Sequence, residues 1–92
     1  MPQDLKYGAV TLERRTIPDD EGVVVFRYRD RQLPAALESY RDACVHGGSP
    51  QHHITGIDRA LAAVRRWQRD NPDRVVTPTS DALLGPRQEQ TT

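Results

Sequence analysis

The chain has few of the residues on which small domains usually rely for stability. Its 92 residues include one cysteine, one phenylalanine and one tryptophan, and 36% of them are hydrophobic. A single cysteine excludes an internal disulfide bond, and a domain of this size buries only about 60% of the surface of its unfolded chain. Small domains in this position are usually stabilised by a metal or by partner subunits. We therefore expect the protein to form a homo-oligomer.

The sequence also lacks an excess of charge of one sign. Its 13 basic and 13 acidic residues cancel to a formal net charge of zero. General nucleic-acid and membrane-surface binders normally carry a clear basic excess, so neither partner is favoured. No apolar run approaches the length of about 20 residues that crosses a membrane. Together with the single unpaired thiol, these features are typical of a cytoplasmic protein.

Two amphipathic patterns flank the linker Gly47 to Pro50. On both sides of this linker, apolar residues recur at steps of three and four residues, the spacing of one face of a helix. They are Leu33, Leu37, Tyr40 and Cys44 before the linker, and Ile54, Ile57, Leu61 and Val64 after it. Two amphipathic helices joined by so short a linker should fold back on each other as an antiparallel hairpin.

Local signals predict where these helices begin and end. The first should begin near Leu33-Pro34, because proline fits the first turn of a helix, and it should end at Gly47. Ser49 is expected to cap the second helix, with Pro50 at its first position. Asn71-Pro72 should end it.

An alternating, β-branched pattern precedes the helices. Residues Tyr7 to Arg15 and Val23 to Arg29 predict two strands, joined by a turn over Ile17 to Gly22. Arg74 to Thr77 is a candidate third strand, and whether the segment 73–85 adds a strand stays open. The fold class is therefore α+β, with an N-terminal antiparallel β-hairpin of two or three strands packed on an antiparallel helix pair.

These elements define one expected domain over residues 1–85. The last residues, 86–92, are polar and are expected to form a disordered tail. The expected core takes apolar residues from every element of the domain. Its members are Val10, Leu12, Val24, Phe26, Leu37, Tyr40, Ile57, Leu61 and Val64.

No pattern typical of a catalytic or metal site is found. Cys44, His46, His52 and His53 surround one loop, but their spacing does not bring them to a common point, so metal binding by them is the less favoured alternative. No glycine-rich phosphate loop follows a strand, and the serines do not have the setting of a nucleophile. We expect neither enzymatic activity nor a cofactor.

Arginine residues provide the candidate contact surfaces. Guanidinium groups bind phosphates and carboxylates through paired hydrogen bonds, and Arg27 and Arg29 alternate along a predicted strand. Arg59 and Arg66 are two turns apart and nearly aligned on the second helix, and Trp67 follows them. Arginine and tryptophan are frequent at the energetic centre of interfaces. We take these five residues as the ligand or partner contacts, with an ordinary solvated surface as the alternative.

Several segments occur in an order that resembles a known group of proteins. They are Tyr7-Gly8-x-Val10-Thr11-Leu12-Glu13-Arg14, Thr16-Ile17, Val23-Val24-Val25-Phe26-Arg27, Leu33-Pro34, Gly48-Ser49-Pro50-x-His52-His53 and Trp67-Gln68. In this order they resemble short uncharacterised proteins encoded by actinobacterial phages and prophages. Those proteins more often have Ala-Gln-Asp where this chain has Tyr28-Arg29-Asp30, so the resemblance does not extend to Tyr28 and Arg29.

The resemblance implies a biological setting, the cytoplasm of a host bacterium, and no particular activity or site. Small phage proteins without catalytic motifs often act by stoichiometric binding. We expect a non-enzymatic accessory protein that binds a host protein or an anionic small molecule such as a nucleotide, and an anti-defence role is one form of this hypothesis. The alternative is a small DNA-binding transcriptional regulator that uses the helix over residues 50–70, because a helix pair with a glycine-containing connection is also typical of helix-turn-helix proteins.

Overall fold

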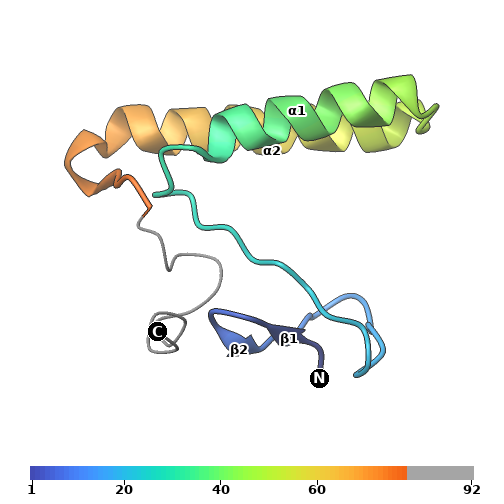
Figure 1. The fold of residues 1–92 in the computed structure, drawn as a ribbon. Coiled ribbons are helices and arrows are strands. Elements are labelled where there is room, and N and C mark those ends of the chain that lie inside the picture. The colour runs from blue at the N-terminus through green and yellow to red at the C-terminus, as the bar shows by residue number, and fades with distance from the viewer. Residues whose placement is uncertain (79–92) are drawn as a thin grey trace, which may run out of the picture. The chain divides into compact units, whose positions relative to one another are not determined.

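The computed structural model describes residues 1–78 and divides the chain into two compact units, Met1–Phe26 and Arg27–Thr77, each of which is described by itself (Figure 1). The first unit contains β1 (Gln3–Asp4) and β2 (Gly8–Ala9). The second contains α1 (Leu33–His46), α2 (Gln51–Asp70) and a 3₁₀ turn over Pro72–Arg74. An antiparallel two-stranded hairpin followed by two helices confirms the α+β class. The expected tail over 86–92 lies outside the described residues.

The strands of the first unit are shorter and lie earlier in the chain than predicted. β1 and β2 pair antiparallel, with Gln3 opposite Ala9 and Asp4 opposite Gly8. Val23 contacts the other edge of β1 through a single parallel bridge to Asp4. Of the predicted strand over Tyr7 to Arg15 only Gly8–Ala9 is a strand, and the predicted strand over Val23 to Arg29 is wrong, because only Val23 forms a bridge.

The cause of this difference is the Asp4 carboxylate. It accepts hydrogen bonds from the backbone N–H groups of Lys6 and Tyr7, each at 2.8 Å, and from that of Val25 at 2.6 Å. Side-chain bonds of this kind compete with a strand ladder for the same backbone groups. They form a tight turn just before Gly8, whose φ of 80° suits glycine. The alternation of apolar residues further along the chain gives no indication of these hydrogen bonds to Asp4.

The two helices begin and end almost where the sequence predicts. The α1–α2 connection has the hydrogen bonds of a Schellman motif, from Ser49 N to Cys44 O at 2.9 Å and from Gly48 N to Val45 O at 3.2 Å. Gly48, with a φ of 79°, is the left-handed residue of this motif, and Gly47 precedes it in a helical conformation. The predicted cap at Ser49 is wrong: its N–H closes α1, and Pro50, in an extended conformation, takes the capping position without a side-chain bond.

Apart from Pro2, the buried apolar residues within residues 1–78 all lie on the two helices. They are Leu33, Cys44, Ile54, Ile57, Leu61 and Val64. Of the expected core, Ile57, Leu61 and Val64 are confirmed, and Val10 and Leu37 are half-buried. The prediction was wrong for the exposed residues Leu12, Val24, Phe26 and Tyr40, and Val24 is 66% exposed. The reason for the first three is that residues 10–29 form no ladder with one covered face.

Side-chain pairs across the helices fix their register. On one side of the pair, Arg41 Nε donates to Asp58 Oδ1 at 2.5 Å, and Arg65 forms an ion pair with Glu38. On the opposite side, the Tyr40 hydroxyl lies 3.1 Å from His53 Nε2. Arg41 lies further along α1 than Glu38 but pairs with an earlier residue of α2, which confirms the antiparallel arrangement (Figure 1).

The segment before α1 is held in place by residues that follow it by about 40 positions. Gln68 Nε2 donates to the carbonyl oxygens of Tyr28 and Asp30, at 2.9 and 2.8 Å. Val76 N donates to Arg29 O at 2.8 Å, and Val76 O accepts from Arg31 N at 2.9 Å. The candidate strand over Arg74 to Thr77 is thus a single parallel bridge within the second unit and adds no strand to the β1–β2 hairpin.

Candidate functional site

The arginines of α2 fall into two groups with different surroundings. Arg65 lies on the side next to α1, where Glu38 neutralises it. Arg59 and Arg66 are exposed, and at about 100° per residue they lie roughly opposite the buried row of α2. Within residues 1–78 neither guanidinium group forms an ion pair or a side-chain hydrogen bond. Helix α2 therefore presents two uncompensated positive charges on its outward side.

The spacing of these two charges determines which kind of anionic ligand they can bind. Arg59 and Arg66 are seven residues apart, which is about 10.5 Å along the helix axis. They project from a convex helix surface, with the small residues Ala62 and Ala63 between them. One small anion cannot satisfy both groups, because binding it tightly needs donors that converge. Two carboxylates or phosphates on an extended surface match this spacing better.

Trp67 lies away from these arginines. It is about 100° round the helix from Arg66, and its ring is half-buried. The Arg74 guanidinium carbon lies 4.8 Å from the ring centroid, a cation–π arrangement. Asn71 reinforces this end of α2, because its Nδ2 donates to the Trp67 carbonyl oxygen at 2.9 Å. The structure thus does not group Trp67 with Arg59 and Arg66.

Arg27 and Arg29 lie apart from both Trp67 and the outward arginines of α2. Both are exposed on the segment that leads into α1. Gln68 binds this segment to α2, and Gln68 lies about 160° round the helix from Arg66, since two positions separate them. The five predicted contact residues therefore occupy three separate places within the second unit.

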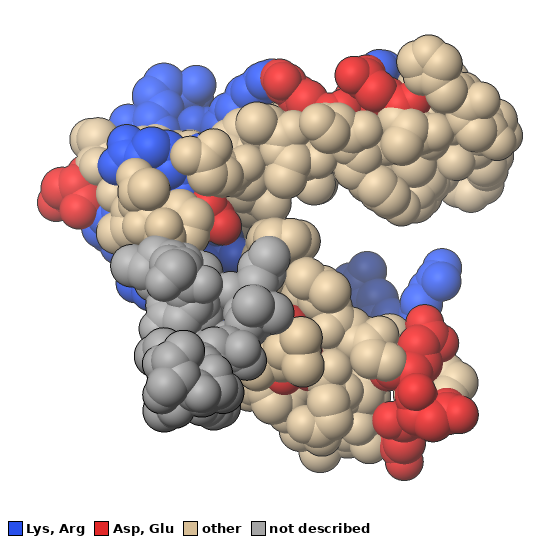
Figure 2. All heavy atoms as spheres, viewed as in Figure 1, with Lys and Arg blue, Asp and Glu red and all other residues tan. Residues whose placement is uncertain are grey.

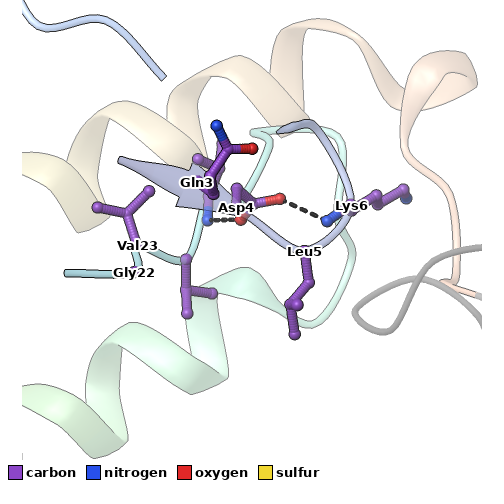
Figure 3. Close-up of a pocket in the computed structure, with 8 residues that line it drawn as sticks. Gln3, Asp4, Leu5, Lys6, Gly22 and Val23 are labelled. Carbon is purple, nitrogen blue, oxygen red and sulfur yellow. Dashed lines mark hydrogen bonds between the residues drawn. The ribbon is translucent and has the colours of Figure 1, made fainter. Parts of the chain in front are cut away.

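The first unit contains a pocket of about 390 Å³. Its lining combines three valines and a leucine with a few polar residues (Figure 3). The residues are Gln3, Asp4, Leu5, Lys6, Gly22, Val23, Val24 and Val25. This volume is within the range of small-molecule sites. Leu5, however, is 78% exposed, so the wall that it forms is open to solvent.

Asp4 is the buried charged residue of this pocket, and its oxygens are already occupied. Three backbone N–H groups donate to its carboxylate, two of them to Oδ1 and one to Oδ2. The hydrogen bond from Tyr7 N–H, followed by those from Val25 and Lys6, lowers the pKa of Asp4 although burial opposes this. Figure 3 shows the Lys6 side chain pointing away from this carboxylate. The Asp4 side chain therefore organises the loop and does not offer a free base to a ligand.

The cysteine and histidines near the helix connection do not converge. Cys44 is buried, and its side chain, next to Tyr40, raises the pKa of that phenol. His46 Nδ1 lies 2.8 Å from the Asp42 carbonyl oxygen, and His53 contacts Tyr40. Across residues 1–78, no three His, Cys, Asp or Glu side chains are grouped so that they could hold a metal ion. Neither described helix combines the length and the apolar character that a membrane span requires.

Sequence reasoning missed two residues that organise the structure, Gln68 and Asp4. Gln68 occupies the same sector of α2 as the buried Ile54, and a polar residue in an apolar row is a recognisable signal. Asp4, three residues before Tyr7-Gly8, has the position of a turn-forming aspartate.

The comparisons with known proteins give no relative from which a role could be transferred. No protein-family model, curated protein or solved structure matches this chain.

Proposed function

We propose that this protein is a non-enzymatic accessory protein of a phage or prophage that binds an acidic surface of a host protein in the host cytoplasm. Arg59 and Arg66 on the outward side of α2 are the proposed contacts. The observation that carries the proposal is that some arginines of the helix pair form ion pairs and others do not. Arg41 and Arg65 are neutralised between the helices, whereas the outward pair has no partner within residues 1–78.

The spacing of the outward pair supports a macromolecule as the partner. A convex surface with charges about 10.5 Å apart fits two acidic groups of one protein face and has no enclosure for a nucleotide. Blocking such a face on a host enzyme requires only stoichiometric binding. An anti-defence role is the biological form of this proposal that agrees with the phage resemblance.

Two observations favour a protein partner over the alternative, a DNA-binding regulator. The helices of a helix-turn-helix cross at about 90–120°, whereas α1 and α2 run antiparallel side by side. The zero net charge also provides little general attraction to a polyanion.

Charge reversal at the two arginines tests this proposal. The double variant Arg59→Glu/Arg66→Glu should retain a captured acidic host protein at least about tenfold less well than the wild type, because like charges now face the partner. The variant Arg14→Glu/Arg15→Glu changes the charge equally at exposed positions of the first unit and should retain it as the wild type does. The immobilised proteins are compared in one actinobacterial extract by quantitative mass spectrometry.

Two further probes separate the alternatives. A 20-base-pair DNA duplex and a nucleoside triphosphate are titrated against the wild type at low and moderate salt. Tight, steeply salt-dependent duplex binding that Arg59→Glu/Arg66→Glu abolishes would establish the regulator instead. Equal capture of the host protein by both double variants would show that the outward arginines are not the contact.

A further inference from the structure

One side of the helix pair carries no charged residue. It is the side on which Tyr40 meets His53, opposite the side of the ion pairs. Its residues are small, aromatic or weakly polar. On α1 they are Ala36, Ser39, Tyr40 and Ala43, and on α2 they are His53, Gly56, Ala60, Ala63 and Trp67. Figure 2 shows charged groups along the upper edge of the helix pair and an uncharged lower edge over its right-hand part. We call this surface the uncharged side.

The spacing on the uncharged side is that of a helix–helix seam. His53, Ala60 and Trp67 recur every seven residues on α2, with Gly56 and Ala63 three residues after the first two. Alternation by three and four residues is the a/d pattern of a coiled coil. On α1, Ala36 and Ala43 are also seven residues apart. Most of these residues are exposed in the structure, and Ala63 and Trp67 are half-buried. The pattern indicates a second seam beyond the one that joins α1 to α2.

We propose that the uncharged side binds the same side of a second copy of this chain, forming a four-helix dimer. The side chains on this side are mostly small, so the same side of a second copy can pack against it. Alanines at positions 36, 43 and 60 allow close approach of another helix. No charged side chain of α1 or α2 has to be removed from water when the two sides meet, and the Arg74 guanidinium group, which lies over Trp67, is at the end of the uncharged side.

Charge at the edge of this side selects how the copies are oriented. Asp42 on α1 and Arg59 on α2 flank the uncharged side, and both are exposed. If α2 lay along α2 of the other copy, the two Arg59 side chains would approach each other. If α2 lies along α1 of the other copy, Arg59 instead approaches the partner's Asp42. We therefore infer antiparallel packing of α2 on α1 across the dimer, with the exposed edge pair setting orientation more than affinity.

The size of the contact sets its strength. Helices of 14 and 20 residues are about 21 and 30 Å long and pack 8–10 Å apart, so each copy contributes a footprint on the order of 500 Å². This is at the lower end for specific interfaces. We expect a dissociation constant of roughly 1–100 μM, so that monomer and dimer exchange over an accessible concentration range.

Sedimentation equilibrium of the full chain from 1 to 500 μM tests the proposal. The wild type should shift from 10.4 kDa to twice that mass with rising concentration. Ala60→Glu places a charge in the centre of the uncharged side and should weaken the dimer at least about tenfold, whereas Ala62→Glu, on an exposed face of the same helix, should not. Both variants keep a strong helix former, and far-UV circular dichroism verifies that they fold.

A second measurement needs no variant. Trp67 is the only tryptophan in the chain, so its fluorescence should shift to longer wavelength when the wild type is diluted through the same range. A wild type that stays monomeric at 500 μM would overturn the proposal. So would equal dimerisation of Ala60→Glu and Ala62→Glu. A monomer in which Ala60→Glu lowers stability would assign the uncharged side to residues 1–26 of the same chain instead of a second copy.

Discussion

Replacing Leu61 by alanine is expected to remove most of the stability of the helix pair. Leu61 is 7% exposed and lies in the buried row of α2 with Ile57 and Val64. Truncating a buried leucine costs about 2–5 kcal/mol, from lost transfer free energy and from the cavity left behind. Small domains have a free energy of unfolding of about 5 kcal/mol, and the helix pair has six buried hydrophobic residues within the described part of the chain. Few other contacts can compensate for the loss.

The measurement is urea unfolding followed by far-UV circular dichroism at one protein concentration, since dimerisation would make stability depend on concentration. Val45→Ala is the matched control, because Val45 is on α1 but 50% exposed. It should change the free energy of unfolding by no more than about 0.5 kcal/mol. Equal effects of the two substitutions would contradict the description of the core.

Replacing Gln68 by alanine should release the segment before α1 while leaving the helices intact. The Gln68 amide donates two hydrogen bonds to this segment, and each contributes about 0.5–1.5 kcal/mol. Losing both should speed hydrogen exchange of the Arg31 and Val76 amides by roughly 5- to 150-fold. These two amides report on the segment because they pair with Val76 O and Arg29 O.

The control for this experiment is Gln51→Ala. Gln51 lies on the same helix, and its amide contacts only Thr55 Oγ1, at 3.3 Å on the exposed surface. Gln51→Ala should leave the hydrogen-exchange rates of the Arg31 and Val76 amides unchanged. If Gln68→Ala also leaves this exchange unchanged, the bridge to Val76 holds the segment without Gln68.

The helices could be predicted from the sequence because their signals are local. Pro34, Gly48 and Asn71 lie within a few residues of the ends that they determine, and the apolar spacing identified the buried row of α2. The strands could not be predicted from alternation. The Asp4 carboxylate takes backbone donors from both nearby and distant residues, and a count of apolar positions contains no information about such bonds.

The candidate site was predictable only in part for the same reason. The alignment of Arg59 and Arg66 follows from helical geometry, and so does their separation from Trp67. The place of Arg27 and Arg29 depends on contacts of their segment with Gln68 and Val76, far along the chain. Whether an arginine is neutralised depends on which residue of the other helix faces it. Glu38 and Asp58 became visible as partners only once the register of the helices was known.

We infer that Glu38 of α1 neutralises Arg65 of α2, that Asp58 of α2 neutralises Arg41 of α1, and that the outward Arg59 and Arg66 are left to a partner. Nuclear magnetic resonance of the arginine Nε–H groups tests it most directly, through their rates of exchange with water. The Arg41 Nε–H, which donates to Asp58, should exchange several-fold more slowly than that of Arg66. Equal exchange rates at Arg41 and Arg66 would contradict the claim.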